Sequence, residues 1–120
     1  DELALKTNQI VIKKSGFLEG TYAVHGIEDV LTERDVLVWI DPFEEEIEKF
    51  SSTLSQVAGV EIIAVTASRL PLPGIRVPDG GRYSEYLQLA AGWMLLVETG
   101  IILGIDIDKP IRARKIGNQY

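Results

Sequence analysis

The chain has 120 residues, of which 46% are hydrophobic and 25% charged, and this composition indicates one soluble globular domain with a sizeable core. Eighteen acidic residues against twelve basic ones give a formal net charge of −6, which argues against a nucleic-acid partner. The absence of cysteine and the presence of one histidine exclude a disulfide framework, a thiol nucleophile and a multi-histidine metal site.

The first 26 residues combine a helical pattern with a loop that carries the one histidine, His25. An apolar stripe and a polar stripe repeat at helical spacing: Leu3, Ile10 and Val11, and Lys6, Gln9 and Lys13. Three glycines in the segment 16–26 then favour a loop. A polar helix face followed by a histidine loop can line a site, although a lone histidine is more often structural than catalytic.

The next segment, Asp35–Asp41, reads DVLVWID and predicts a strand that is buried on both faces, as in a parallel sheet. Asp41 and Pro42 are typical of a helix start, with the aspartate as N-cap and the proline in the first helical position. The acidic run Glu44–Glu46 then lies in the first turn, where the helix dipole favours negative charge. A metal site in this run is the weaker alternative.

One apolar stripe continues through the predicted helix up to Gly59, at Phe43, Ile47, Phe50, Leu54 and Val57. A second apolar run, Val60–Ala67, predicts another buried strand. Strand, amphipathic helix and strand within this length form a βαβ unit, for which a right-handed crossover is expected.

The remaining third of the chain predicts one short strand and one long helix. Three prolines surround the strand at Gly74–Val77, and a turn follows at Asp79–Gly81. The helix at Glu85–Leu103 is apolar nearly all round, so we expect it in the core or in a subunit interface. Charged residues and glycines interrupt it too often for a membrane span. A basic tail closes the chain at Lys109–Tyr120.

Two motifs bracket nearly the whole chain. The first is E-L-A-L-K at Glu2–Lys6 with H-G at His25 and Gly26, and the second is G-I-D-I-D-K-P at 104–110 followed by Lys115. Together they resemble the C-terminal sugar isomerase (SIS) domain of glucosamine-fructose-6-phosphate aminotransferase and its relatives, which include amino-sugar-phosphate deaminases.

The resemblance implies a three-layer αβα sandwich with a parallel, flavodoxin-like sheet whose first strand is missing from this chain. Residues 1–120 would be a single SIS domain, the C-terminal half of a two-domain protein. The chain opens without an initiator methionine or a signal peptide, which agrees with a fragment or a processed product. The family further implies a cytoplasmic homodimer without a cofactor, a metal or a membrane partner.

By the same resemblance, the substrate is a phosphorylated sugar or amino sugar, and isomerisation, deamination and deglycation are the candidate reactions. His25 would open the sugar ring across the dimer interface, and Lys115 would form an imine with the ketose. Lys6 would lie at the edge of the site. A histidine suits proton transfer near neutral pH, and a deprotonated lysine suits imine formation.

The sequence departs from the family at the position of the proton-shuttling glutamate, which is occupied by Gln9. An amide can hydrogen-bond a sugar but cannot accept a proton from carbon. Glu19, in the following loop, is an alternative base. The tail also differs at 111–114, and the Ser/Thr-rich loop that holds the phosphate in the family is absent. A sugar-phosphate-binding module without catalysis and a plain dimerisation domain therefore stay open as alternative functions.

Overall fold

A computed structural model describes residues 1–109 of the chain, which form two compact units. Unit 1 combines Asp1–Phe17 with the chain from Gly92 onward, and unit 2 is Leu18–Ala91. The longest helix, α3 (Ser84–Ile102), begins in unit 2 and continues in unit 1. We describe each unit by itself.

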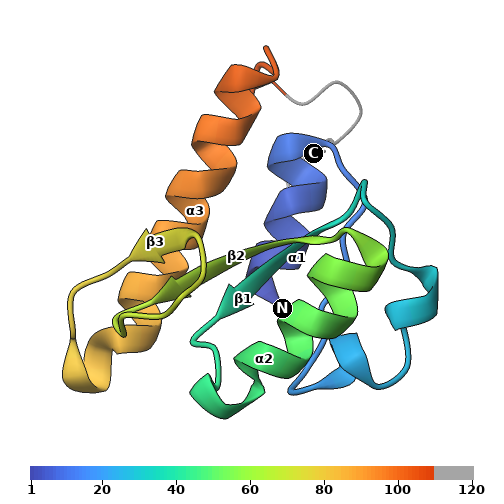
Figure 1. The fold of residues 1–120 in the computed structure, drawn as a ribbon. Coiled ribbons are helices and arrows are strands. Elements are labelled where there is room, and N and C mark those ends of the chain that lie inside the picture. Colours follow the sequence, from blue (N-terminus) through green and yellow to red (C-terminus); the bar gives the residue numbers. More distant parts are fainter. Residues whose placement is uncertain (110–120) are drawn as a thin grey trace. The chain divides into compact units, whose positions relative to one another are not determined.

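Unit 2 is built on a parallel sheet of three strands, β1 (Val36–Ile40), β2 (Glu61–Thr66) and β3 (Gly74–Arg76) (Figure 1). The strands lie in the order β1-β2-β3, and β1 pairs with β2 in register from Val36 opposite Glu61 to Ile40 opposite Val65. The structure therefore confirms an α/β fold with a parallel sheet, and all three predicted strands are present.

The strand order corrects one expectation. In a flavodoxin-like sheet of order 2-1-3-4-5, the first strand lies between the second and the third. If the first strand alone were missing, β1 and β2 would be the second and third strands and would not be neighbours. They pair directly, which differs from the arrangement expected when only the first strand is missing.

Burial along β1 alternates, which corrects the prediction that this strand is covered on both faces. Val36 is 57% exposed, and Val38 and Ile40 are exposed as well, whereas Trp39 between them is buried. Helix α2 covers the face of β1 that carries Trp39, and the opposite face, with Val36, Val38 and Ile40, is exposed, whereas β2 buries residues on both of its faces. A continuous apolar run does not distinguish an edge strand from a central one.

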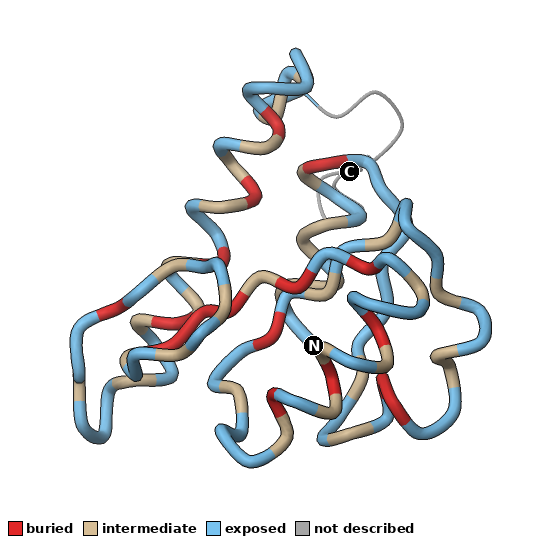
Figure 2. The backbone as a smooth tube through the Cα atoms, viewed as in Figure 1, coloured by how far each residue is buried: buried red, intermediate tan, exposed pale blue. Residues whose placement is uncertain are grey.

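The core of unit 2 lies between the sheet and helix α2 (Ile47–Phe50), which continues as a π-helical segment, Ser51–Ala58. The Phe50 ring stacks on the Trp39 ring with centroids 3.9 Å apart and an angle of 18° between the planes. Ile47 and Leu54 are buried beside them. Figure 2 shows buried stretches along this helix and along the strands that it covers. These positions confirm the middle of the predicted apolar stripe.

The two ends of that stripe do not follow the prediction, because Phe43 is half-exposed and Val57 is 84% exposed. Phe43 precedes the helix, which begins with a 3₁₀ turn at Glu44–Glu46. Val57 lies in the π-helical segment, whose wider turns no longer follow a 3.6-residue period. Gly59 ends the helix as predicted, with a left-handed φ of +73°.

Asp41 does not cap this helix. It has a φ of +50°, and no side-chain bond caps the 3₁₀ turn that follows. Its Oδ1 instead accepts a hydrogen bond of 3.2 Å from the Thr66 hydroxyl at the end of the neighbouring strand β2. The aspartate therefore ties two strand ends together, a pairing that the local Asp-Pro signal did not reveal.

Unit 1 packs helix α1 (Glu2–Lys6) and its π-helical continuation Thr7–Val11 against the C-terminal part of α3. The methyl groups of Leu3 lie directly against Gly92, where a β-carbon would have no room. Val11 and Leu96 are buried in this unit. The stripe predicted for the first helix is thus confirmed, and its close contact depends on a glycine in α3.

Helix α3 has nearly the predicted bounds but is less covered than its composition suggests. Trp93 is 43% exposed, Met94 63% and Ile102 81%. Within residues 1–109, no helix combines the length and the apolar character that crossing a membrane requires.

Candidate functional site

His25 follows a 3₁₀ turn, Tyr22–Val24, whose position is fixed by the core of unit 2. Ala23 and Val24 are buried at 2% and 4% exposure, and the His25 N–H donates to the Tyr22 carbonyl at 3.3 Å. The backbone before the imidazole is therefore anchored, while the His25 side chain itself is exposed to solvent.

Lys49 of α2 is the nearest polar neighbour of this imidazole, with its Nζ 2.6 Å from His25 Nε2. A lysine ammonium can only donate hydrogen bonds, so His25 Nε2 is the acceptor in this contact when Lys49 is charged. The contact places the amino group of Lys49 directly beside the imidazole.

Glu28, three positions after His25, adds a carboxylate to this group. Its Oε2 accepts the Gly26 N–H at 2.6 Å. Hydrogen bonds from its own backbone N–H and from that of Gly26 hold the pKa of the Glu28 carboxyl below its ordinary value of 4.5, and His25 adds a smaller attraction. We call His25, Lys49 and Glu28 the histidine cluster.

The histidine cluster offers three kinds of chemistry on one surface of unit 2. An imidazole can take or give a proton near neutral pH, an ammonium can stabilise an oxyanion, and a carboxylate can accept a hydroxyl proton in a hydrogen bond. All three groups are on the outside of the unit or only partly buried, so a polar ligand can reach them.

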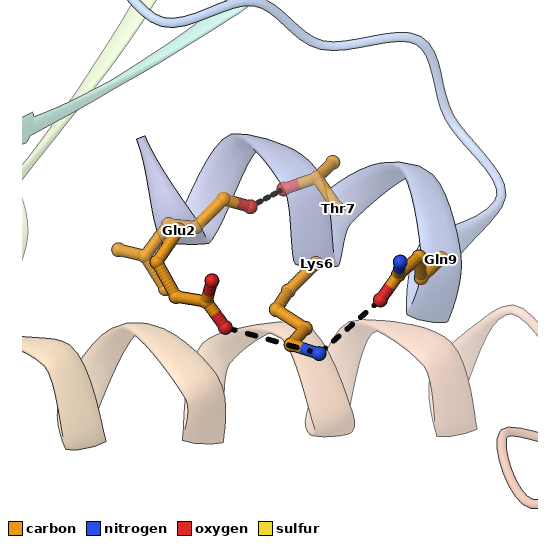
Figure 3. A network of polar contacts seen from close by, with 5 residues as sticks. Glu2, Lys6, Thr7 and Gln9 are labelled. Atoms are coloured by element: carbon orange, nitrogen blue, oxygen red, sulfur yellow. Dashed lines mark hydrogen bonds and ion pairs between the residues drawn. The ribbon is translucent and has the colours of Figure 1, made fainter. Parts of the chain in front are cut away.

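A second polar group lies on the first helix, in unit 1. Lys6 Nζ donates to Gln9 Oε1 at 3.2 Å and lies 3.8 Å from Glu2 Oε1. Figure 3 shows both contacts meeting at the Lys6 ammonium, with Glu2 on one side of it and Gln9 on the other. We call these three residues the lysine network.

The structure therefore brings together two of the five predicted site residues, Lys6 and Gln9. Glu19 is exposed, and its carbonyl accepts the Tyr22 N–H at 3.3 Å, but its carboxylate has no hydrogen-bond partner among residues 1–109. Lys115 lies outside the residues that the structure describes. His25 contacts Lys49 instead, and Glu28 lies near enough to interact electrostatically with it.

Sequence reasoning missed both Lys49 and Glu28. Lys49 is 24 positions from His25 and adjoins the buried Phe50, and no local pattern links a helix residue to a distant loop. Glu28 had a usable signal, because an acidic residue that follows a glycine by two positions can accept the N–H of that glycine.

The acidic run Glu44–Glu46 forms part of no metal site here. Within the part of the chain that the structure describes, no three His, Asp or Glu side chains are grouped so that they could hold a metal ion.

Neither a scan against protein-family models nor a search of curated proteins finds a match for this chain.

Proposed function

We propose that this chain is an SIS-type domain that acts on a phosphorylated hexose or amino sugar. The observation that carries the proposal is the exposed imidazole of His25, which contacts the Lys49 ammonium at 2.6 Å. His25 occupies the position that opens the sugar ring in the family that the sequence resembles. A cytoplasmic location belongs to the same proposal.

Ring opening requires that the ring oxygen gains a proton and that the anomeric hydroxyl loses one. A neutral imidazole carries an N–H and a lone pair on its two nitrogens, so it can serve either half of this exchange. The Lys49 ammonium beside Nε2 would stabilise the oxygen anion that forms as the hydroxyl loses its proton. Lys115 would form the imine with the open-chain ketose.

The proposal also covers the complete fold, that is, the larger sheet to which the three strands would belong. We infer that β1, β2 and β3 are the third, fourth and fifth strands of a three-layer αβα sandwich, because sequential pairing fits only that run. The chain would then be the C-terminal domain of a protein with two SIS domains. The sugar phosphate would be shared between these domains.

The test follows proton exchange between C1 and C2 of glucose 6-phosphate or fructose 6-phosphate in deuterated water, using the complete protein. Loss of His25 in His25→Asn should slow the exchange by about 10²–10⁴-fold, and an open-chain analogue should recover most of this loss. Lys49→Met should give a smaller defect of the same kind. Lys14→Met removes an exposed lysine elsewhere and is the control for charge. Equal rates in His25→Asn and the unmodified protein would refute the proposed role.

A binding module without catalysis is the second candidate, and Gln9 supports it. Its amide oxygen accepts from Lys6 at 3.2 Å, so the position of the family's base holds a neutral acceptor that is already engaged. Gln9→Glu restores a carboxylate. If exchange appears only in Gln9→Glu, the natural chain binds without catalysing this reaction, whereas exchange in the unmodified protein supports an enzyme with another base, such as Glu19.

We further propose that the protein forms a homodimer, and the exposed apolar residues of α3 support this proposal. Trp93, Met94 and Ile102 are all more than 40% exposed, which is costly for large apolar side chains in water. Sedimentation at tens of micromolar protein should therefore detect a dimer. A single monomeric species in that range would contradict this part of the proposal while leaving the chemistry of His25 open to its own test.

A further inference from the structure

Unit 2 contains a hollow that no part of the proposed function uses. It has a volume of about 340 Å³ and is lined by the connection between β2 and β3 and by residues of both strands. Four polar residues contribute to its wall: Thr66, Ser68, Arg69 and Arg76. Leu70 and Leu72 add apolar surface, and both also pack against the core of the unit.

The hollow exists because the connection is unusually short. Parallel strands are normally joined by a crossover of a dozen or more residues, which usually forms a helix on the sheet. Here residues 67–73 suffice, and they form no helix. No crossover helix therefore fills the space beside β3, and Thr66 and Arg76, which are register partners, lie on the same face of the sheet there.

The charge of this hollow is not neutralised by the protein. Arg69 and Arg76 come from the connection and from the end of β3, and neither has a carboxylate oxygen within 4.0 Å among residues 1–109. The one ion pair in that range joins Lys6 and Glu2, in the other unit. The two guanidinium groups concentrate positive charge in one hollow of a chain whose net charge is −6.

The polar wall is also ordered by its own hydrogen bonds. The buried Thr66 hydroxyl accepts the Ser68 N–H at 3.1 Å and donates to Asp41 Oδ1 at 3.2 Å. These bonds fix the start of the connection and leave the Ser68 hydroxyl without a hydrogen bond to the described residues. The Ser68 hydroxyl, which precedes Arg69 in the chain, is thus available to donate a hydrogen bond to a ligand.

We propose that this hollow binds a phosphate monoester. The forked donors of arginine match phosphate oxygens, and two guanidinium groups from different segments can surround a tetrahedral dianion better than a planar carboxylate. The volume of the hollow is at the lower end of the range of about 300–1,000 Å³ for small-molecule pockets. This inference does not depend on the proposed function.

The experiment titrates the 120-residue chain with inorganic phosphate and, separately, with glucose 6-phosphate. Binding is followed in amide spectra and by calorimetry. Both probes should shift the amide signals of Ser68, Arg69 and Arg76. Arg69→Gln and Arg76→Gln should each weaken binding by about tenfold, because each removes charge-assisted hydrogen bonds. Arg34→Gln removes the same charge from an exposed arginine outside the hollow and should leave binding unchanged.

The outcomes separate the possible ligands. Tighter binding of glucose 6-phosphate than of phosphate identifies an esterified sugar, and equal binding identifies free phosphate as a sufficient ligand; both support the site. The proposal fails if neither probe shifts these three signals, or if Arg34→Gln weakens binding as much as Arg69→Gln does. Circular dichroism of each variant confirms that the fold persists, as expected for exposed arginines.

Discussion

The histidine cluster and the lysine network both gather charged groups, but they are built differently. In the lysine network, all contacts span three or four positions of one helix, and a carboxylate balances the lysine. In the histidine cluster, the central contact joins residues 24 positions apart, and two basic side chains face each other at 2.6 Å.

This difference separates a local arrangement from one that the fold must impose. Helix geometry alone brings residues at i+3 and i+4 together, and exposed pairs of this kind contribute only a few tenths of a kcal/mol. Two basic groups have no such reason to meet, so the packing of α2 and of the turn before His25 must hold them in contact. An arrangement that packing must maintain is the better candidate for function.

The largest change in stability is expected when Phe50, which packs next to the histidine cluster, is truncated. Phe50 is 2% exposed and stacks on Trp39. Phe50→Ala should lower the free energy of unfolding by about 3–5 kcal/mol, measured by urea denaturation. It should also separate Lys49 from His25. Val57→Ala, in the exposed part of the same helix, should change stability by less than about 0.5 kcal/mol. Similar losses in the two variants would contradict the observed core.

The second test targets the packing that carries the lysine network. Gly92→Ala adds a methyl group where Leu3 leaves no room. Although alanine favours helices over glycine, overpacking should lower the free energy of unfolding by about 1–3 kcal/mol. Leu3→Ala should remove this cost, so that adding Gly92→Ala to it is neutral or stabilising. A double-mutant cycle measures the coupling, and purely additive effects would contradict direct contact.

The third test uses acid to probe the histidine cluster. The pKa of Glu28 is lowered in the folded chain, so its carboxylate stabilises the fold above the ordinary pKa of 4.5. This contribution is lost as the pH falls through the lower, folded-state pKa. Glu28→Gln should therefore reduce the acid-induced loss of stability below about pH 4.5, measured by denaturation at several pH values. A variant with the same pH profile as the unmodified chain would show that Glu28 has no such role.

The smallest effect should come from the lysine network itself. Lys6→Met removes both polar contacts but keeps the aliphatic stem. We expect a change of about 0.2–0.5 kcal/mol, which should diminish as salt is added. A loss above about 1 kcal/mol would show that the lysine network is more than a surface pair, and would weaken the contrast with the histidine cluster.

The sequence was informative wherever a pattern is local. Apolar runs located β1 and β2, and the surrounding prolines located β3. The helical stripe identified Ile47, Phe50 and Leu54 as core residues. Asp41 followed the local rule for a helix cap, but a bond to Thr66 of another strand determined its conformation. For the site, the sequence singled out His25, Lys6 and Gln9 as candidates. Lys6 and Gln9 do meet, because they lie three positions apart on one helix.

What the sequence could not supply was contact between distant segments. Lys49 reaches His25 only because Phe50 fixes α2 on the sheet, and nothing near either residue encodes that distance. The hollow beside β3 arises from the path of a short connection, and the spacing of Arg69 and Arg76 does not predict that they share a wall. The exposure of β1 depends on which of its faces another element covers, and an apolar run does not reveal this.

The exposed edge of β1 also affects how the chain behaves in concentrated solution. Among residues 1–109, no strand pairs with the outer side of the segment VLVWI, which has high β-propensity and no charge. Such a segment can template pairing with another copy during expression or refolding. Asp35 and Asp41, at its two ends, are positioned as gatekeepers against that reaction. Replacing both aspartates with asparagine should speed aggregation, visible as light scattering, without removing any residue of the core.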